Sequence, residues 1–262
     1  MRIALTIAGS DSSGGAGIQA DLKTFQRFGV FGTSAIAAIT AQNTRGVSKW
    51  EPVSVELVRA QIDAVADDLP PAAVKTGMLG NAAVASTVAA AIRDHSFRNY
   101  VLDPVMVATS GDPLFEQDAI DVIRRQLVPQ AALVTPNLHE AAILTGEKIE
   151  DEDGMARAAE TMVHDMGAQA VLIKGGHLES GDRVVDILYD GDVRTFRGQR
   201  ISTANTHGTG CTLSAAITAH LANGESLHAA VRRAIDYVHN AIATAPGLGS
   251  GHGPLNHLAG DS

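Results

Sequence analysis

Apolar residues along the chain form short runs that alternate with longer segments of helical spacing. The short runs, at residues 3–8, 34–40, 73–76, 100–102, 132–134 and 170–173, end at polar or glycine residues. Continuous apolar runs of this length, separated by helices, are typical of buried parallel strands. The pattern therefore predicts an α/β fold, a three-layer α/β/α sandwich with a mostly parallel central sheet.

Helices are predicted where Ala, Val, Ile, Leu and Met recur every three or four positions. These segments are residues 18–28, 56–68, 82–94, 117–127 and 154–166, and right-handed crossovers would place them outside the sheet. Runs 184–189 and 193–196 flank the turn sequence Asp190-Gly191-Asp192 and predict an antiparallel hairpin. Helices over 210–223 and 226–245 close the fold. Because the chain contains no linker, repeat or low-complexity segment, residues 1–262 are expected to form a single domain.

Composition narrows the class of partner. The 262 residues are 45% hydrophobic, which is enough for a substantial core. The net charge of -9, without any run of Lys and Arg, argues against nucleic acid or an anionic membrane surface as a partner. Every apolar stretch is shorter than the roughly 20 residues of a spanning helix, and the first is shorter than a signal-peptide core. The single cysteine excludes an intrachain disulfide and a Cys-cluster metal site. We expect a small-molecule partner and a cytoplasmic protein.

The strongest local feature is a glycine loop at residues 205–212, NTHGTGCT, followed by the apolar helix segment 213–221. Gly208 and Gly210 allow close backbone approach, and the unpaired N–H groups of a helix start attract phosphate oxygens. The loop is therefore a candidate site for a transferring phosphoryl group. An ordinary glycine-rich turn with a Thr cap is the alternative.

Cys211 falls in the first turn of that helix. The positive end of a helix dipole lowers the pKa of a thiol and favours the thiolate, which would let Cys211 act as a base toward an alcohol. The alternative is a buried, small apolar residue.

A second glycine cluster, at residues 9–17, follows the first predicted strand. It contains no Walker pattern and lacks the full spacing of a dinucleotide fingerprint, so a Rossmann fold is rejected. Asp21 lies one turn into the next helix, where it would either bind a polar ligand or remain solvated.

Two acidic residues and one lysine lie just after predicted strands. Asp103 follows one strand, and Glu140 lies three residues after Asn137; such carboxylates can hold Mg²⁺ through waters and bridge phosphates. Glu140 would alternatively be a helix residue favoured by the dipole. Lys174, beside a glycine pair, is a candidate contact for a nucleotide phosphate, with a surface lysine as the alternative.

In this order, the pieces resemble the ribokinase-like superfamily and, within it, the hydroxymethylpyrimidine and phosphomethylpyrimidine kinases of thiamine biosynthesis. The resemblance spans nearly the whole chain. It rests on AGSDSSGGAGIQAD (residues 8–21), TAQNT (40–44), KTGML (75–79), DPV (103–105), TPN (135–137) with Glu140, the loop ending in Cys211, and GHGPL (251–255).

The resemblance implies a ribokinase-like fold and a role for each candidate residue. Gly9, Asp21, Gln42 and Met78 would form the pyrimidine pocket; Asp103 and Glu140 would organise Mg²⁺; Lys174, His207 and Thr209 would meet ATP phosphates; Gly208, Gly210 and the Cys211 amide would form an anion hole. An aminopyrimidine matches a carboxylate and an amide, and a Met side chain adapts to a flat ring.

The implied activity is a kinase that uses ATP to phosphorylate 4-amino-5-hydroxymethyl-2-methylpyrimidine and then its monophosphate. The resemblance also implies a homodimer. Sugar kinases of the superfamily generally carry Asp where this chain has Cys211. Ile235 is a second departure, at a position where relatives often place a Lys that contacts nucleotide.

Two alternatives stay open. Pyridoxal or pyridoxine kinase activity would place a related flat alcohol in the same pocket, although Gln42 and Met78 favour the pyrimidine. A catalytically silent ligand-binding paralogue is disfavoured by the joint presence of Asp103, Glu140, Lys174 and Cys211.

Overall fold

The computed structural model describes residues 1–106, 117–176, 178 and 181–260. The strands are β1 (Ile3–Asp11), β2 (Phe31–Asn43), β3 (Gly46–Pro52), β4 (Ala73–Thr76), β5 (Tyr100–Leu102), β6 (Leu133–Val134), β7 (Val171–Ile173), β8 (Arg183–Tyr189) and β9 (Val193–Gln199). Over the described residues they form one sheet in the order β3-β2-β1-β4-β5-β6-β7-β8-β9. The six central strands, β2, β1, β4, β5, β6 and β7, run parallel, whereas β3 at one edge and β8 and β9 at the other pair antiparallel.

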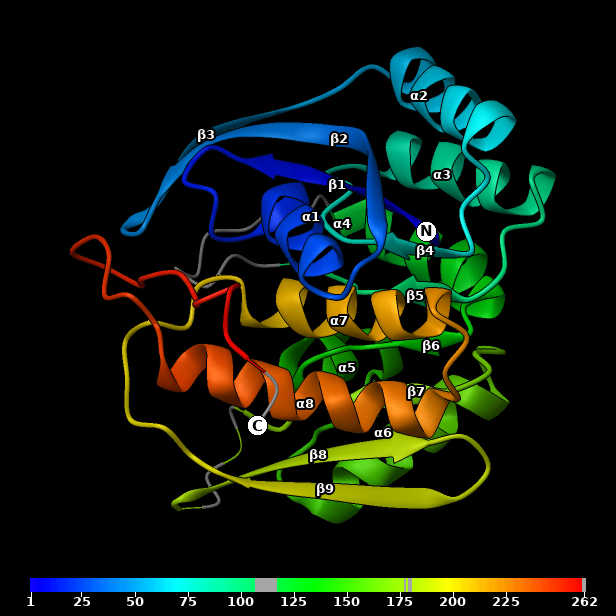
Figure 1. Cartoon of the computed structure of the whole chain (residues 1–262). Coiled ribbons are helices and arrows are strands. Elements are labelled where there is room, and N and C mark those ends of the chain that lie inside the picture. Colours follow the sequence, from blue (N-terminus) through cyan, green and yellow to red (C-terminus); the bar gives the residue numbers. More distant parts are fainter. Residues whose placement is uncertain (107–116, 177, 179–180, 261–262) are drawn as a thin grey trace.

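Helices cover both faces of this sheet (Figure 1). They are α1 (Gly17–Arg27), α2 (Val55–Asp68), α3 (Ala82–Asp94), α4 (Gln117–Val122), α5 (Leu138–Thr145), α6 (Glu152–His164), α7 (Thr209–Ala222) and α8 (Leu227–Ala243). Buried residues of α1, α7 and α8 share one apolar core with one sheet face, and those of α2, α3, α5 and α6 share a second core with the other. The predicted three-layer α/β/α sandwich is confirmed.

The structure differs from two predicted elements and contains two others, β3 and α5, that were not predicted. The strand predicted at 34–40 extends over the whole of β2, and β3, which pairs with it, was not predicted because its exposed edge position leaves no apolar alternation. The helix predicted at 117–127 is α4 followed by a π-helical turn, Ile123–Leu127. Helix α5 is only 8 residues long and was not predicted as an element.

The parallel strands bring distant sequence segments to one edge of the sheet. Asp11 ends β1, Met78 follows β4, Asp103 follows β5, Asn137 follows β6 and Lys174 follows β7. Because the carboxyl ends of parallel strands lie on the same side, these residues converge there, as expected for a ligand site in an open α/β sheet.

The chain that follows α8 returns to this edge and is drawn in red in Figure 1. The His252 N–H donates to the Thr44 carbonyl at 2.7 Å, and the His207 N–H donates to the Gly253 carbonyl at 3.1 Å. Leu255 is buried in the core shared by α1, α7 and α8. This tail therefore joins the turn between β2 and β3 to the loop that precedes α7. Across the part of the chain that the structure describes, every helix is too short or too polar to cross a membrane.

Candidate active site

A cavity of about 690 Å³ opens at the carboxyl edge of the sheet. We divide its lining into three parts. The acceptor end is named for the predicted pocket of the alcohol that accepts the phosphoryl group, and the other two parts are the acidic centre and the apolar end. The acceptor end includes Gly9, Gln42, Gly77 and Met78; the centre includes Asp103, Glu140, Lys174 and the start of α7; the apolar end includes Val184, Phe196, Leu213, Ile235, Val238 and Ile242. One cavity thus holds almost all of the predicted site residues.

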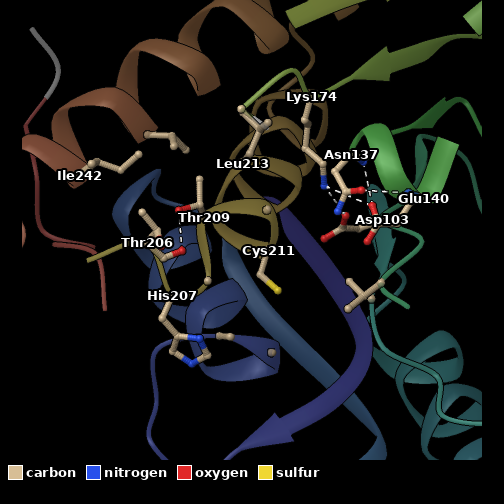
Figure 2. A pocket seen from close by; sticks show the side chains of 18 of the residues that line it. Asp103, Asn137, Glu140, Lys174, Thr206, His207, Thr209, Cys211, Leu213 and Ile242 are labelled. Atoms are coloured by element: carbon tan, nitrogen blue, oxygen red, sulfur yellow. Dashed lines mark hydrogen bonds and ion pairs between the residues drawn. The ribbon is translucent and has the colours of Figure 1, made fainter. Parts of the chain in front are cut away.

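Three charged side chains form the centre (Figure 2). Lys174 Nζ donates to Asp103 Oδ1 at 3.0 Å and lies 3.9 Å from Glu140 Oε2. Asp103 also has the hydroxyl of Ser214, from α7, 3.1 Å from its Oδ2. Both carboxylates are at least 95% buried, so the lysine compensates negative charge that water does not reach.

The pKa values of the Asp103 and Glu140 carboxyl groups are shifted in opposite directions. Burial alone would raise the pKa of Asp103, but the charges of Lys174 and Lys75 and the bonds from Lys174 and Ser214 hold it below its usual value. Burial and the neighbouring Asp103 raise the pKa of Glu140 to about 7, against the opposing charge of Lys174. Near neutral pH, Asp103 is therefore the permanent anion of the centre.

Glu140 has a structural task as well. Its Oε2 accepts the Asn137 N–H at 2.8 Å, and its own N–H donates to Asn137 Oδ1 at 2.9 Å. These two bonds form a capping box at the start of α5. The two readings of Glu140 are therefore compatible: it caps a helix, and its carboxylate stays within reach of Lys174 and Asp103.

Helix α7 begins at the glycine loop, and Gly208 is its N-cap with φ +82. A Cβ at Gly208 would overlap the carbonyl oxygen of Gly15, so only glycine fits. A Cβ at Gly210 would lie 3.1 Å from Lys174 Nζ, which puts the first turn of α7 directly against the acidic centre. Within the described residues, the N–H groups of Gly210 and Cys211 donate to no backbone carbonyl. Two donors at the positive end of a 14-residue helix therefore face the cavity.

The expected lowering of the Cys211 pKa is wrong. The thiol lines the cavity, but burial raises its pKa to about 11, and the charges of Asp103 and Asp21 act in the same direction. Lys75 and the Gly17 N–H oppose this shift without cancelling it. Two nearby carboxylates and loss of solvent outweigh the helix dipole, so Cys211 is a neutral thiol near pH 7.

The acceptor end holds Gly9, Gln42 and Met78, as the resemblance implies. A Cβ at Gly9 would lie 3.1 Å from Met78 Sδ, so the glycine leaves space beside the thioether. Met78 packs in a small apolar cluster with Trp50 and Val105. The Thr40 hydroxyl lies 3.2 Å from Gln42 Oε1 and 3.0 Å from the Ser10 carbonyl oxygen, and its one hydrogen is shared between these two acceptors. This end of the cavity is a slot with an apolar wall and one amide.

Asp21 lies beneath the pocket and is absent from the cavity lining, contrary to its expected place. Its side chain is fully buried, and its Oδ2 accepts Lys75 Nζ at 2.8 Å and the Thr6 hydroxyl at 2.6 Å. Burial alone would lower the pKa of Lys75, but the neighbouring charge of Asp21 raises it above its usual value. Lys75 was missed from the sequence, although a lysine inside a strand of four buried residues is itself a signal.

His207 and Thr209 also differ from their expected orientation. The ring of His207 lies on the far side of the α7 start from Lys174 (Figure 2), and its Nε2 lies 2.8 Å from Asp11 Oδ2. The Thr209 hydroxyl donates to the Thr206 carbonyl at 2.8 Å, which leaves its oxygen free only to accept. Asp11 was not predicted as a site residue, because nothing in its glycine-rich surroundings distinguishes it from a turn residue.

Fold and site together define a small-molecule phosphotransferase of the ribokinase-like class. The family model for phosphomethylpyrimidine kinase matches residues 11–256, and the chain belongs to that family.

Two relatives and one solved structure illustrate the similarity. The hydroxymethylpyrimidine/phosphomethylpyrimidine kinase of Rhizobium meliloti is 55% identical over 261 residues, 98% of this chain and 97% of its own length. The protein of the same name from Bacillus subtilis is 50% identical over 257 residues, 98% of this chain and 94% of its own. The ADP complex of Bacillus subtilis pyridoxal kinase matches with a TM-score of 0.91 and 40% identity, covering 99% of this chain and 98% of that one.

Proposed function

We propose that the protein transfers the γ-phosphoryl group of ATP to the hydroxymethyl oxygen of 4-amino-5-hydroxymethyl-2-methylpyrimidine, and then phosphorylates the monophosphate to the diphosphate in thiamine biosynthesis. The observation that carries the proposal is a single cavity in a chain of this family. In it, the Gly9 and Met78 slot lies beside two free N–H groups of α7 and the charges of Asp103 and Lys174. Phosphoryl transfer depends mainly on such positioning and charge stabilisation.

The acceptor slot suits a flat, polar ring. Met78 offers a polarizable wall, Gly9 removes a side chain from the facing position, and the Gln42 amide can pair with the donor and acceptor edge of an aminopyrimidine. Asp21 affects this pocket indirectly. Its ion pair holds Lys75 in place, and Lys75 is part of the cavity lining.

The centre suits a hydrated Mg²⁺ bound together with ATP phosphates. Over the described residues, no group of three or more His, Cys, Asp or Glu side chains could hold a metal alone. Asp103 and Glu140 provide two carboxylates beside the α7 start, and Mg²⁺ in kinases is commonly held by one or two carboxylates, waters and the substrate phosphates. When bound, Mg²⁺ would neutralise charge on the phosphates, while Lys174 and the N–H groups of Gly210 and Cys211 hold phosphate oxygens.

The apolar end suits the nucleotide base. Ile235 and Ile242 of α8 and Leu213 of α7 line it. Arg200 lies there too, but its guanidinium donates to the carbonyls of Gly176 and Leu178, at 2.7 and 2.9 Å. Base binding at this end would therefore rest on packing, and Ile235 contributes to it where a lysine would contribute charge.

A time course with the hydroxymethylpyrimidine and MgATP tests this function directly. We expect the monophosphate to appear first and the diphosphate to follow, each in step with ADP. A catalytically silent paralogue would bind the pyrimidine without forming product, and that result would contradict the proposal.

Pyridoxal is the second candidate acceptor, because a pyridoxal kinase is among the solved structures that resemble this chain. Comparing kcat/KM for the two alcohols decides between them. We expect the pyrimidine to be preferred, and a higher value for pyridoxal would reverse the ranking.

Replacing Cys211 with alanine is expected to slow the first phosphorylation more than the second. A hydroxyl must lose a proton, whereas a phosphate monoester is already anionic near pH 7. Because the thiol pKa is about 11, the thiolate fraction grows about tenfold per pH unit below it. The wild-type rate of the first step should therefore rise about tenfold per pH unit between pH 7 and 9. The variant and the second step should lack this rise and show at most the roughly twofold change that completing the ionisation of Glu140 allows. Equal losses on both substrates would remove the base role and leave a role in shaping the anion hole.

From the family resemblance we also propose a cytoplasmic homodimer. Light scattering on the purified protein tests the oligomeric state, and a monomer throughout the concentration range of the assay would contradict it.

A further inference from the structure

The two glycine loops at the site are in direct backbone contact. One is the acceptor loop, residues 11–17, and the other is the phosphate loop, residues 205–211. A Cβ at Gly208 would overlap the carbonyl oxygen of Gly15, and a Cβ at Gly15 would clash with the ring of His207. The His207 ring therefore fills the space beside Gly15, and two contacts cross between the loops: the His207–Asp11 bond, and the contact of the Gly17 N–H with the Cys211 thiol.

The Asp11 carboxylate holds the acceptor loop together by accepting hydrogen bonds from several of its residues. It is 97% buried and accepts the N–H groups of Ser13, Gly15 and Ala16 at 2.8, 3.1 and 2.8 Å. His207 Nε2, 2.8 Å from Asp11 Oδ2, comes from the other loop. Burial alone would raise the pKa of Asp11, but the bonds from His207 and Ser13 hold it below its usual value. An ionised carboxylate has only acceptors, so His207 Nε2 carries the hydrogen of this bond.

The acceptor loop is tied in turn to the pocket that would hold the acceptor. The Ser12 hydroxyl lies 2.8 Å from both the N–H and the carbonyl of Gln42. A Cβ at Gly17 would overlap the Gly9 carbonyl, so the end of this loop lies directly on Gly9. A shift of the acceptor loop would therefore move Gly9 and Gln42, two residues of the acceptor end.

On the other side, His207 is directly joined to the anion hole. The next residue is Gly208, the N-cap of α7, and the free N–H groups of Gly210 and Cys211 follow. The His207 N–H is itself held by the Gly253 carbonyl at 3.1 Å. The His207 ring is thus bonded to the acceptor loop, and the His207 backbone is bonded to the C-terminal tail. The anion hole, from Gly208 to Cys211, begins at the next residue.

We infer that the buried Asp11–His207 pair is a positioning element that sets the distance between the acceptor pocket and the anion hole. The inference rests on the proposed function, because transfer requires the acceptor oxygen and the phosphoryl group to be aligned. His207 Nε2 also lies 3.4 Å from Gln42 Nε2, but both nitrogens carry hydrogens, so no hydrogen bond joins them. We therefore expect each half of the cavity to bind its own ligand without the pair, whereas a displacement of about 1 Å between the halves can cost on the order of 100-fold in rate. His207 then acts through Gly208, as a positioning residue.

The test compares three variants of α7 or its N-terminal loop. His207→Ala removes the bond, and His207→Gln keeps an N–H donor of similar reach. His220→Ala is the matched control, because His220 is also buried, lies in the last turn of α7 and contacts a carboxylate, with Nδ1 2.9 Å from Glu225 Oε1. The measurements are kcat and KM for MgATP and for the pyrimidine alcohol, the melting temperature, and hydrogen exchange of the amides at 205–213 and 11–17.

We expect His207→Ala to lower kcat by roughly 10- to 100-fold while both KM values stay within about threefold. Exchange should become faster in both loops, and His207→Gln should restore most of the rate and protection. His220→Ala should lower the melting temperature without either effect. The inference is overturned if His207→Ala acts mainly on KM, if His220→Ala lowers kcat as much, or if exchange changes in only one loop. Failure of the proposed function is distinguishable, since it appears as absent product in the wild type, and the exchange measurement still decides the role of the pair.

Discussion

Replacing Gly208 with alanine is expected to lower kcat for both phosphorylations by at least about 100-fold. Gly208 has φ +82, a conformation that costs an L-residue about 1–2 kcal/mol. The larger effect is steric, because the new Cβ would overlap the carbonyl oxygen of Gly15, a backbone atom that cannot rotate away as the end of a side chain could. The phosphate loop must move, and with it the two N–H groups of the anion hole.

Gly224→Ala is the matched control for this substitution. Gly224 follows the other end of α7 with φ +87, and beyond its two chain neighbours no described residue has a heavy atom within 4 Å of where its Cβ would be. It therefore carries the same backbone strain without the clash and lies away from the cavity lining. Steady-state kinetics and thermal unfolding of both variants separate the two effects. If Gly208→Ala retained the wild-type kcat and lost only the stability that Gly224→Ala loses, the anion-hole assignment would be wrong.

The parallel core of this fold was predictable because the central strands β4, β5, β6 and β7 are buried on both faces. The β4 segment AVKT and the β7 segment VLI are continuous buried runs, and the intervening helices have one apolar stripe. Strand β3 was not predictable in the same way. Its residues are partly or fully exposed at the sheet edge, so its pairing with β2 produces no regular alternation of apolar and polar residues in the sequence.

The site was predictable where strand ends and glycines mark it, and less so where burial decides the chemistry. Asp103 and Lys174 follow predicted strands, and topology alone brings them together. Sequence position gives the helix turn in which Cys211 lies, but the two carboxylates that raise its pKa come from segments over 100 residues away. Asp21 and His207 were assigned by family pattern, which gives their neighbourhood and leaves open which way each side chain points.

Lys75→Met is expected to lower the free energy of unfolding by about 3–5 kcal/mol, the usual cost of leaving one partner of a buried ion pair uncompensated. Lys75 and Asp21 are both fully buried, and only the Thr6 hydroxyl would remain as a donor to Asp21 Oδ2. Lys49→Met is the matched control. Lys49 pairs with Glu51 at 2.6 Å, but the two side chains are 71% and 69% exposed, so the same substitution there should leave stability unchanged within error.

The cost of Lys75→Met should also depend on pH and on Asp21. Burial raises the pKa of Asp21, and removing Lys75 takes away the charge that opposes this shift. The folded variant then binds a proton more readily than the unfolded chain, so its free energy of unfolding should rise relative to wild type as the pH falls from 8 to 5.5. Adding Asp21→Asn to Lys75→Met should recover stability at pH 8, since the amide carries no charge and its oxygen still accepts from Thr6. Denaturant unfolding of the two single variants and the double variant at both pH values measures this coupling. A Lys75→Met variant as stable as Lys49→Met, or a double variant whose loss is the sum of the single losses, would show that the pair does not hold the floor of the site together.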